Sequence, residues 1–329
     1  MVQSGDTLWT ASDARRADLN ITGFLAWLSD RGHGFCGYQD LWEWSVTDVA
    51  GFWQAVWDYF DIIHDGDLAE VMTADPMPRT RWFTGTRANY AENVLRLENQ
   101  GDPNRTMMSH ASELRALDQI SWAEVGAAVR NLATRMRDMG IGKGDRVVAY
   151  MPNIPETVIA MLATTAIGAT WSSAAPEFGA KTVIDRFSQI EPALVFATNG
   201  YRYGGKDFDR IDDLQKIADA LPTARHLVML DYQPKARKAP EFSGEVLTWE
   251  EMLAGPEVMA SDFRYERVPS DHPLWILFRP APRVCPSQSF RATTVSFLST
   301  TNPRPSILRF PKAARCFSIR PPAGWCGIR

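Results

Sequence analysis

The chain of 329 residues has few of the features that mark secreted, membrane-spanning or metal-binding proteins. It contains no run of about 18 apolar residues, so the sequence predicts no membrane span. Its N-terminus has no apolar core of the kind found in secretory signals, and we therefore expect a cytoplasmic location. Only five histidines and four cysteines occur, and their spacing is unlike that of zinc ligands. We expect no metal site in this chain.

Two further absences narrow the range of functions. The G-x-S-x-G sequence that carries the nucleophile of α/β-hydrolases does not occur. The net charge of −4, from 35 basic and 39 acidic residues, gives no sign of a nucleic-acid partner. Residue types and spacing alone therefore identify no catalytic residue.

Acidic residues are missing from the end of the chain. Residues 279–329 contain eight Arg, one Lys and eight of the 21 prolines but no Asp or Glu, a charge of +9. The preceding 278 residues have 26 basic and 39 acidic residues, a charge of −13. Because this segment also lacks a helical apolar period, we expect little regular structure in it.

The rest of the chain alternates short apolar runs with amphipathic segments. The apolar runs that predict buried strands are residues 146–150, 169–173, 193–197, 226–230 and 273–278. Helices are predicted at residues 21–28, 49–60, 121–139, 153–168, 181–190, 209–221 and 247–253. Strands that alternate with helices imply parallel pairing. We therefore predict an α/β fold with an incomplete doubly wound, mainly parallel sheet.

Capping residues locate several of these helix starts. Ser121 and Glu124 have the spacing of a capping box, and Ser45 with Asp48 resembles one before the next apolar stripe. Asn153 stands where the N-cap of the helix after strand 146–150 is expected.

Three segments of the sequence resemble those of a known family: MPNIPETVIAMLATTAIGATWSSAAPEFG, IDRFSQIEP and GYRYGGK. With them the chain resembles the adenylate-forming acid–CoA ligases, and WSS-x-x-P-x-FG with GYRYGGK is similar to the branch that uses acetoacetate. The resemblance covers residues 38–278. It implies a helical N-terminal cap region at residues 1–97, a partial AMP-binding domain at 98–278 and a separate tail at 279–329.

The resemblance implies a two-step reaction with ATP, Mg²⁺, acetoacetate and CoA, and no nucleic acid or membrane partner. A carboxylate attacks the α-phosphate of ATP to give an acyl-adenylate and pyrophosphate, and the CoA thiol then displaces AMP. In this family the phosphate loop, the adenine and ribose contacts and the catalytic lysine all follow the point that matches residue 278. We therefore assign no catalytic residue and expect the chain as written to be inactive.

The sequence after residue 278 departs from the family pattern. Family members continue from this strand into SSGTTGLPK, whereas here Phe278 is followed by RPAPRVCPSQ, whose prolines lack the N–H groups that a phosphate loop needs. Synonymous codons for residues 280–288 exist that read Gly-Thr-Thr-Gly-Leu-Pro-Lys-Pro when shifted by two bases. We therefore expect a frameshift near the Phe278 codon. Two alternatives to an acetoacetate–CoA ligase stay open. One is a non-catalytic binding protein with a basic tail, and the other is a ligase for another short carboxylic acid.

Residues 200–206 (GYRYGGK) are the candidate binding site. They follow the predicted strand 193–197, and ligands of open α/β sheets bind outside such carboxyl ends. The matching place in acetyl-CoA synthetases contacts the nucleotide end of CoA. The resemblance thus implies that Arg202 and Lys206 contact CoA phosphates, and that Gly204 and Gly205 permit close approach. The residues alone favour a tight, solvated turn with incidental charge, and only the resemblance makes the CoA interpretation as strong.

Overall fold

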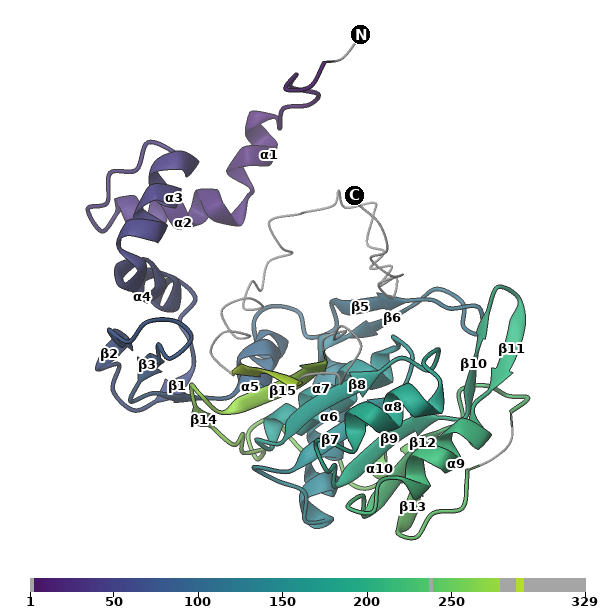
Figure 1. The fold of residues 1–329 in the computed structure, drawn as a ribbon. Helices are drawn as coiled ribbons and strands as arrows, with labels where there is room; N and C mark the ends of the chain where they lie inside the picture. Colours follow the sequence, from purple (N-terminus) through teal and green to yellow (C-terminus); the bar gives the residue numbers. More distant parts are fainter. Residues whose placement is uncertain (1–2, 237–238, 279–287, 293–329) are drawn as a thin grey trace.

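The structure is a computed structural model that describes residues 3–236 and 239–278, and the backbone of residues 288–292. Its centre is a seven-stranded sheet with the order β13-β12-β9-β7-β8-β15-β16 (Figure 1). These strands are β7 (Arg146–Tyr150), β8 (Thr170–Ala174), β9 (Leu194–Thr198), β12 (His226–Leu230), β13 (Glu245–Thr248), β15 (Pro273–Phe278) and β16 (Gln288–Ala292). All pairs are parallel except β15 with β16, so the predicted α/β fold with a mainly parallel sheet is confirmed.

Helices cover both faces of the sheet, as a parallel sheet requires. They are α6 (Trp122–Asp138), α7 (Pro155–Ala166), α8 (Ala180–Phe187), α9 (Ile211–Asp219) and α10 (Trp249–Leu253). Alternate residues of β7 point to opposite faces. Val148 packs in the core under α8 and α9, and Val147 packs in the larger core under α6, α7 and α10.

The N-terminal region forms a separate group of helices beside the sheet (Figure 1). The helices are α1 (Asp13–Ala17), α2 (Asn20–Ser29), α3 (Tyr38–Thr47) and α4 (Val49–Tyr59). Their own small core contains Phe24, Leu28, Leu41 and Val56. The aromatic stripe that predicted a helix after residue 48 therefore serves packing.

Short pairings join this region to the sheet domain. One small sheet has the order β1-β4-β14, so it connects residues 64–65 with residues 268–269 just before β15. The remaining short elements are β1 (His64–Asp65), β2 (Glu70–Met72), β3 (Trp82–Thr84), β4 (Arg87–Ala88), α5 (Tyr90–Leu95), the 3₁₀ turn at Arg96–Asn99, β5 (Thr106–His110), β6 (Asp118–Ser121), β10 (Gly200–Tyr203), β11 (Lys206–Asp209) and β14 (Val268–Pro269).

Asn89 fixes this junction from a fully enclosed position. Its side-chain nitrogen donates to the backbone carbonyls of Thr165, Ala166 and Glu266 at 2.9, 3.2 and 2.7 Å. Its side-chain oxygen accepts the Glu92 N–H at 3.1 Å and so caps α5. One buried amide therefore holds together three segments that are distant in the sequence.

The predicted helix caps have mixed outcomes. The Ser121–Glu124 capping box is confirmed, with both reciprocal hydrogen bonds present. Asn153 is not the N-cap: Ile154 holds that position, because Pro155 has a preset φ and needs no N–H partner as the first helical residue. Ser45 lies inside α3, whereas Asp48 caps α4 by accepting the Gly51 N–H at 2.9 Å.

The segment after residue 278 adds one short strand to the sheet. We expected little regular structure beyond residue 278, and in the described part residues 288–292 pair antiparallel with β15, from Phe278 opposite Gln288 to Pro273 opposite Ala292. An open edge offers a row of N–H and C=O groups, and this five-residue segment contains no proline to prevent pairing. Residues 279–287 and 293–329 lie outside the described residues.

None of the helices in the described ranges has the length and apolarity that a membrane crossing needs.

Candidate functional site

The candidate site is the hairpin of β10 and β11, which stands out beyond the end of β9 (Figure 1). Tyr203 is paired with Lys206, so Gly204 and Gly205 form a two-residue turn. Both glycines have positive φ, +60° and +73°. Two-residue hairpin turns of this kind require positive φ at both central positions, which favours glycine. The Gly-Gly turn, Gly204–Gly205, is thus a direct consequence of the sequence.

The amides of the Gly-Gly turn hold a carboxylate. The Gly204 and Gly205 N–H groups donate to the two oxygens of Glu113, each at 2.7 Å. Glu113 lies in the loop between β5 and β6. Successive N–H groups in a turn form a concave anion-binding surface. The turn therefore has the geometry to hold an anion, and in this structure the anion belongs to the chain itself.

Arg202 is engaged on the same hairpin. Its Nε and Nη2 donate to the two carboxylate oxygens of Asp207, its cross-strand partner, at 2.5 and 3.1 Å. This hydrogen bonding with Arg202 lowers the pKa of Asp207 to about 2. Gln233 also donates to Asp207 at 2.8 Å, and the Lys235 ammonium lies 3.5 Å from it. Three side chains, Arg202, Gln233 and Lys235, therefore surround the exposed Asp207 carboxylate.

Lys206 is exposed at the exit of the turn, and the described part of the chain gives it no salt bridge. The hairpin carries all four predicted residues, Arg202, Gly204, Gly205 and Lys206. Arg202 pairs across the strands with Asp207 and Lys206 pairs with Tyr203, so the alternation of side chains places Arg202 and Lys206 on opposite faces of the hairpin. In this structure Arg202 donates its hydrogen bonds to Asp207, and the two glycine amides donate theirs to Glu113.

The loop that carries Glu113 is anchored on both sides of that residue. Tyr232, just after β12, donates through its hydroxyl to Ser112 Oγ at 2.6 Å. Arg115 donates to the Glu156 carboxylate at 2.7 and 3.0 Å, and its guanidinium lies 4.7 Å from the centre of the Tyr232 ring. Loops that follow β5, β9 and β12 therefore meet at the hairpin.

Sequence reasoning missed the carboxylates of this site. Asp207 could have been found, because a two-residue turn at Gly204–Gly205 makes Arg202 and Asp207 cross-strand partners. Glu113 had no local signal, since it is 91 residues from Gly204 in the sequence. Trp171 and Ser173, which belong to the WSS string of the family resemblance, lie in β8, where Trp171 is buried.

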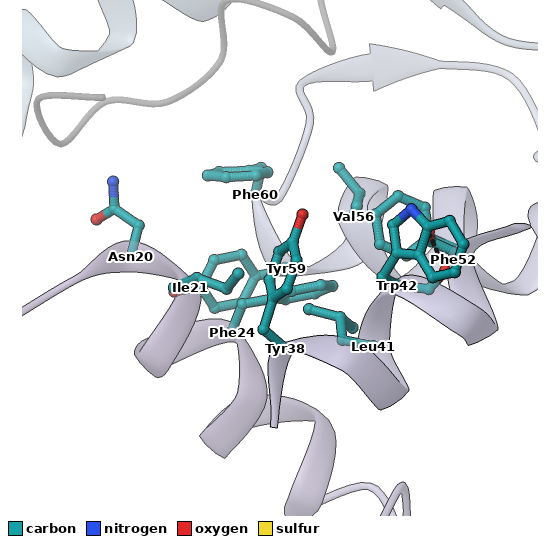
Figure 2. A pocket seen from close by; sticks show the side chains of 11 residues that line it. Asn20, Ile21, Phe24, Tyr38, Leu41, Trp42, Phe52, Val56, Tyr59 and Phe60 are labelled. Carbon is teal, nitrogen blue, oxygen red and sulfur yellow. Dashed lines mark hydrogen bonds between the residues drawn. The ribbon is translucent and has the colours of Figure 1, made fainter. Parts of the chain in front are cut away.

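A second concave feature lies among α2, α3 and α4 (Figure 2). This pocket of about 270 Å³ is lined mainly by aromatic and aliphatic side chains, among them Phe24, Tyr38, Trp42, Phe52 and Phe60. Its lining contains no carboxylate, imidazole, amine or guanidinium group. It therefore offers no charged side chain for acid–base catalysis or for pairing with a phosphate.

Comparison with known protein families is decisive for the identity of the fold. The model of the family described as AMP-binding enzyme matches residues 96–278, and that of the acetyl-coenzyme A synthetase N-terminus matches residues 38–94. The chain belongs to the AMP-binding enzyme family. The family resemblance read from the sequence is thereby confirmed.

Individual relatives support the same family assignment. An acetoacetyl-coenzyme A synthetase of Rhizobium meliloti is 38% identical over 259 residues, which are 78% of this chain and 38% of the relative. The acetoacetyl-CoA synthetase of Mus musculus is 35% identical over 246 residues, 73% of this chain and 36% of the relative. The chain thus spans less than two fifths of the length of these relatives.

The solved structure of acetoacetyl-CoA synthetase from Streptomyces lividans has the same fold. It superposes with a TM-score of 0.83 and 36% identity, covering 90% of this chain and 45% of that chain. A malonamoyl-CoA synthetase of Penicillium aethiopicum, 34% identical over 256 residues and 75% of this chain, is also similar.

Proposed function

We propose that this chain carries the N-terminal part of an AMP-forming acetoacetate–CoA ligase. The observation that carries the proposal is the match to relatives named acetoacetyl-CoA synthetase over about three quarters of the chain, together with the fold of the solved enzyme. In the complete reaction, acetoacetate and ATP give an acyl-adenylate and pyrophosphate, and CoA then displaces AMP. ATP, acetoacetate and CoA are thus the proposed small-molecule partners, and we retain cytoplasmic location as a prediction.

We propose that the β10–β11 hairpin contributes the CoA phosphate contacts. Arg202 and Lys206 supply positive charge, and the Gly-Gly turn supplies two adjacent amides whose present occupant is a carboxylate. Charge-assisted hydrogen bonds from backbone amides and guanidinium groups are the usual contacts of phosphate in proteins.

We also propose that residues 279–329 are the product of a frameshift. The family match ends at residue 278, and the acidic residues end at about the same place. The codon compatibility of residues 280–288 with Gly-Thr-Thr-Gly-Leu-Pro-Lys-Pro supports the same position. As written, the chain then lacks the phosphate loop, and the proposed ligase chemistry requires the restored frame.

The malonamoyl-CoA synthetase relative favours a second candidate, a ligase for another short acid. Restoring the frame after the Phe278 codon and assaying AMP release tests both. Acetoacetate should give the highest kcat/KM, and preference for malonamate would support the second candidate. If the restored chain forms no AMP with any short acid while remaining folded, the ligase proposal is wrong and a binding protein is favoured.

A further inference from the structure

We propose that Glu113 sets the affinity of the Gly-Gly turn for phosphate by competing for the same two amides. The inference rests on the proposed role of the hairpin in binding CoA. It adds a specificity-determining residue from a loop that no motif indicated.

The geometry makes the competition direct. The two oxygens of Glu113 each accept one N–H, from Gly204 and from Gly205, at 2.7 Å. A phosphate that used these amides would place two of its own oxygens at the same positions. Both anions cannot occupy them, because each N–H points to one acceptor and the two negative charges repel.

The side chain can leave without disturbing the loop that carries it. Glu113 is exposed, as are both glycines. Its neighbours hold the loop through other contacts: Ser112 accepts from the Tyr232 hydroxyl, and Arg115 is paired with Glu156. Rotation of one side chain therefore opens the turn while its surroundings stay in place.

The charges around the turn give this rotation a large electrostatic effect. Arg202 and Asp207 neutralise one another as a bidentate pair. Lys235 adds positive charge 3.5 Å from Asp207, Lys206 follows the turn on the opposite face of the hairpin, and Glu113 is the carboxylate directed at the turn amides. Its departure removes one negative charge from the surface that would receive a phosphate, and leaves two free donors.

The test measures binding of adenosine 3′,5′-bisphosphate, the nucleotide end of CoA, to the full chain by calorimetry. Glu113→Gln retains the size of the side chain but removes its charge, and Glu113→Ala empties the turn. Glu250→Gln on α10 is the matched control. We expect Glu113→Gln and Glu113→Ala to bind about tenfold more tightly than the parent, which corresponds to loss of one charge-assisted competitor, and the control to bind like the parent.

Amide NMR signals of Gly204 and Gly205 separate this inference from the CoA proposal. In the parent and both variants these two signals should shift on addition of the bisphosphate. If both folded Glu113 variants bind the bisphosphate no more tightly than the parent, the inference is overturned, and the Glu113 contact serves only to hold the loop against the hairpin. Binding that leaves the glycine signals unmoved would also overturn it, while a CoA site elsewhere would survive.

Inorganic pyrophosphate provides the second probe. If pyrophosphate moves the glycine signals more strongly in Glu113→Gln than in the parent, but neither CoA nor the bisphosphate binds, the role of Glu113 stands and the CoA assignment falls. If none of the three probes binds any variant, both proposals are wrong.

Discussion

Two arginine–carboxylate pairs with nearly the same geometry lie in very different places in this molecule. Arg130 donates to Glu98 at 2.6 and 3.1 Å, and Arg202 donates to Asp207 at 2.5 and 3.1 Å. The first pair is buried, with 3% of Arg130 and 9% of Glu98 exposed. The second lies on the exposed hairpin, where Arg202 is partly exposed and Asp207 exposed.

The difference teaches what each pair can do. A buried pair has lost its hydration, so removing one partner leaves an uncompensated charge in the core. An exposed pair is hydrated in either state and contributes little to folding. The Arg130 pair therefore stabilises the fold, whereas the proposed CoA contact requires Arg202 to exchange Asp207 for a phosphate, which an exposed pair permits at low cost.

The largest expected effect is on the buried pair. Glu98→Gln should lower the free energy of unfolding by about 3–5 kcal/mol, because the Arg130 guanidinium remains buried without its counter-charge. Urea unfolding followed by circular dichroism measures this change, with the exposed Glu250→Gln as control. A loss below about 1 kcal/mol would mean that water reaches the pair and that the contrast with the hairpin is false.

The second largest expected loss of stability comes from removing the buried side-chain amide of Asn89. Asn89→Ala leaves the carbonyls of Thr165, Ala166 and Glu266 without this donor and removes the cap of α5. We expect a loss of about 3 kcal/mol, since buried unsatisfied groups cost about 1–3 kcal/mol each. Asn104→Ala, at an exposed position, is the control for the same urea experiment. Equal stability of the two variants would refute the structural role of Asn89.

The exposed pair should matter far less for folding. Arg202→Ala is expected to leave the urea midpoint of unfolding nearly unchanged, as for other solvent-exposed ion pairs. The same urea experiment tests this. A cost like that of Glu98→Gln would show that the hairpin is a folding element, and its proposed availability to ligands would be lost.

The buried strands of the fold could be predicted from the sequence, whereas the environments of the two arginine–carboxylate pairs could not. β12 and β15 occupy the predicted residues, because uninterrupted apolar runs bounded by turns specify buried strands. β13, and the pairing of β5 with β6, were missed, since Glu245–Thr248 and Asp118–Ser121 are mostly exposed and have no apolar run. Arg130–Glu98 and Glu113 with the Gly-Gly turn join residues 32 and 91 positions apart, and only the tertiary fold brings them together.

The smallest expected effect is a pH dependence of the hairpin. Hydrogen bonding to Arg202 lowers the pKa of Asp207 from its usual 3.8 to about 2. A carboxyl with a lowered pKa contributes stability above its unfolded value, and that stability is lost as the pH falls through the folded value. The Arg202 Nε–H NMR signal should therefore change with a midpoint near pH 2, and Asp207→Asn should abolish the change. A midpoint near pH 4 would contradict the tight pairing.

The central claim, that the hairpin serves CoA in an AMP-forming ligase, is tested most directly by separating the two half-reactions of the frame-restored chain. Arg202→Ala and Lys206→Ala should each raise the KM for CoA and leave pyrophosphate release from ATP and acetoacetate nearly unchanged, because CoA enters only at the second step. Equal impairment of adenylate formation and thioester formation would contradict the claim and make the hairpin a structural turn.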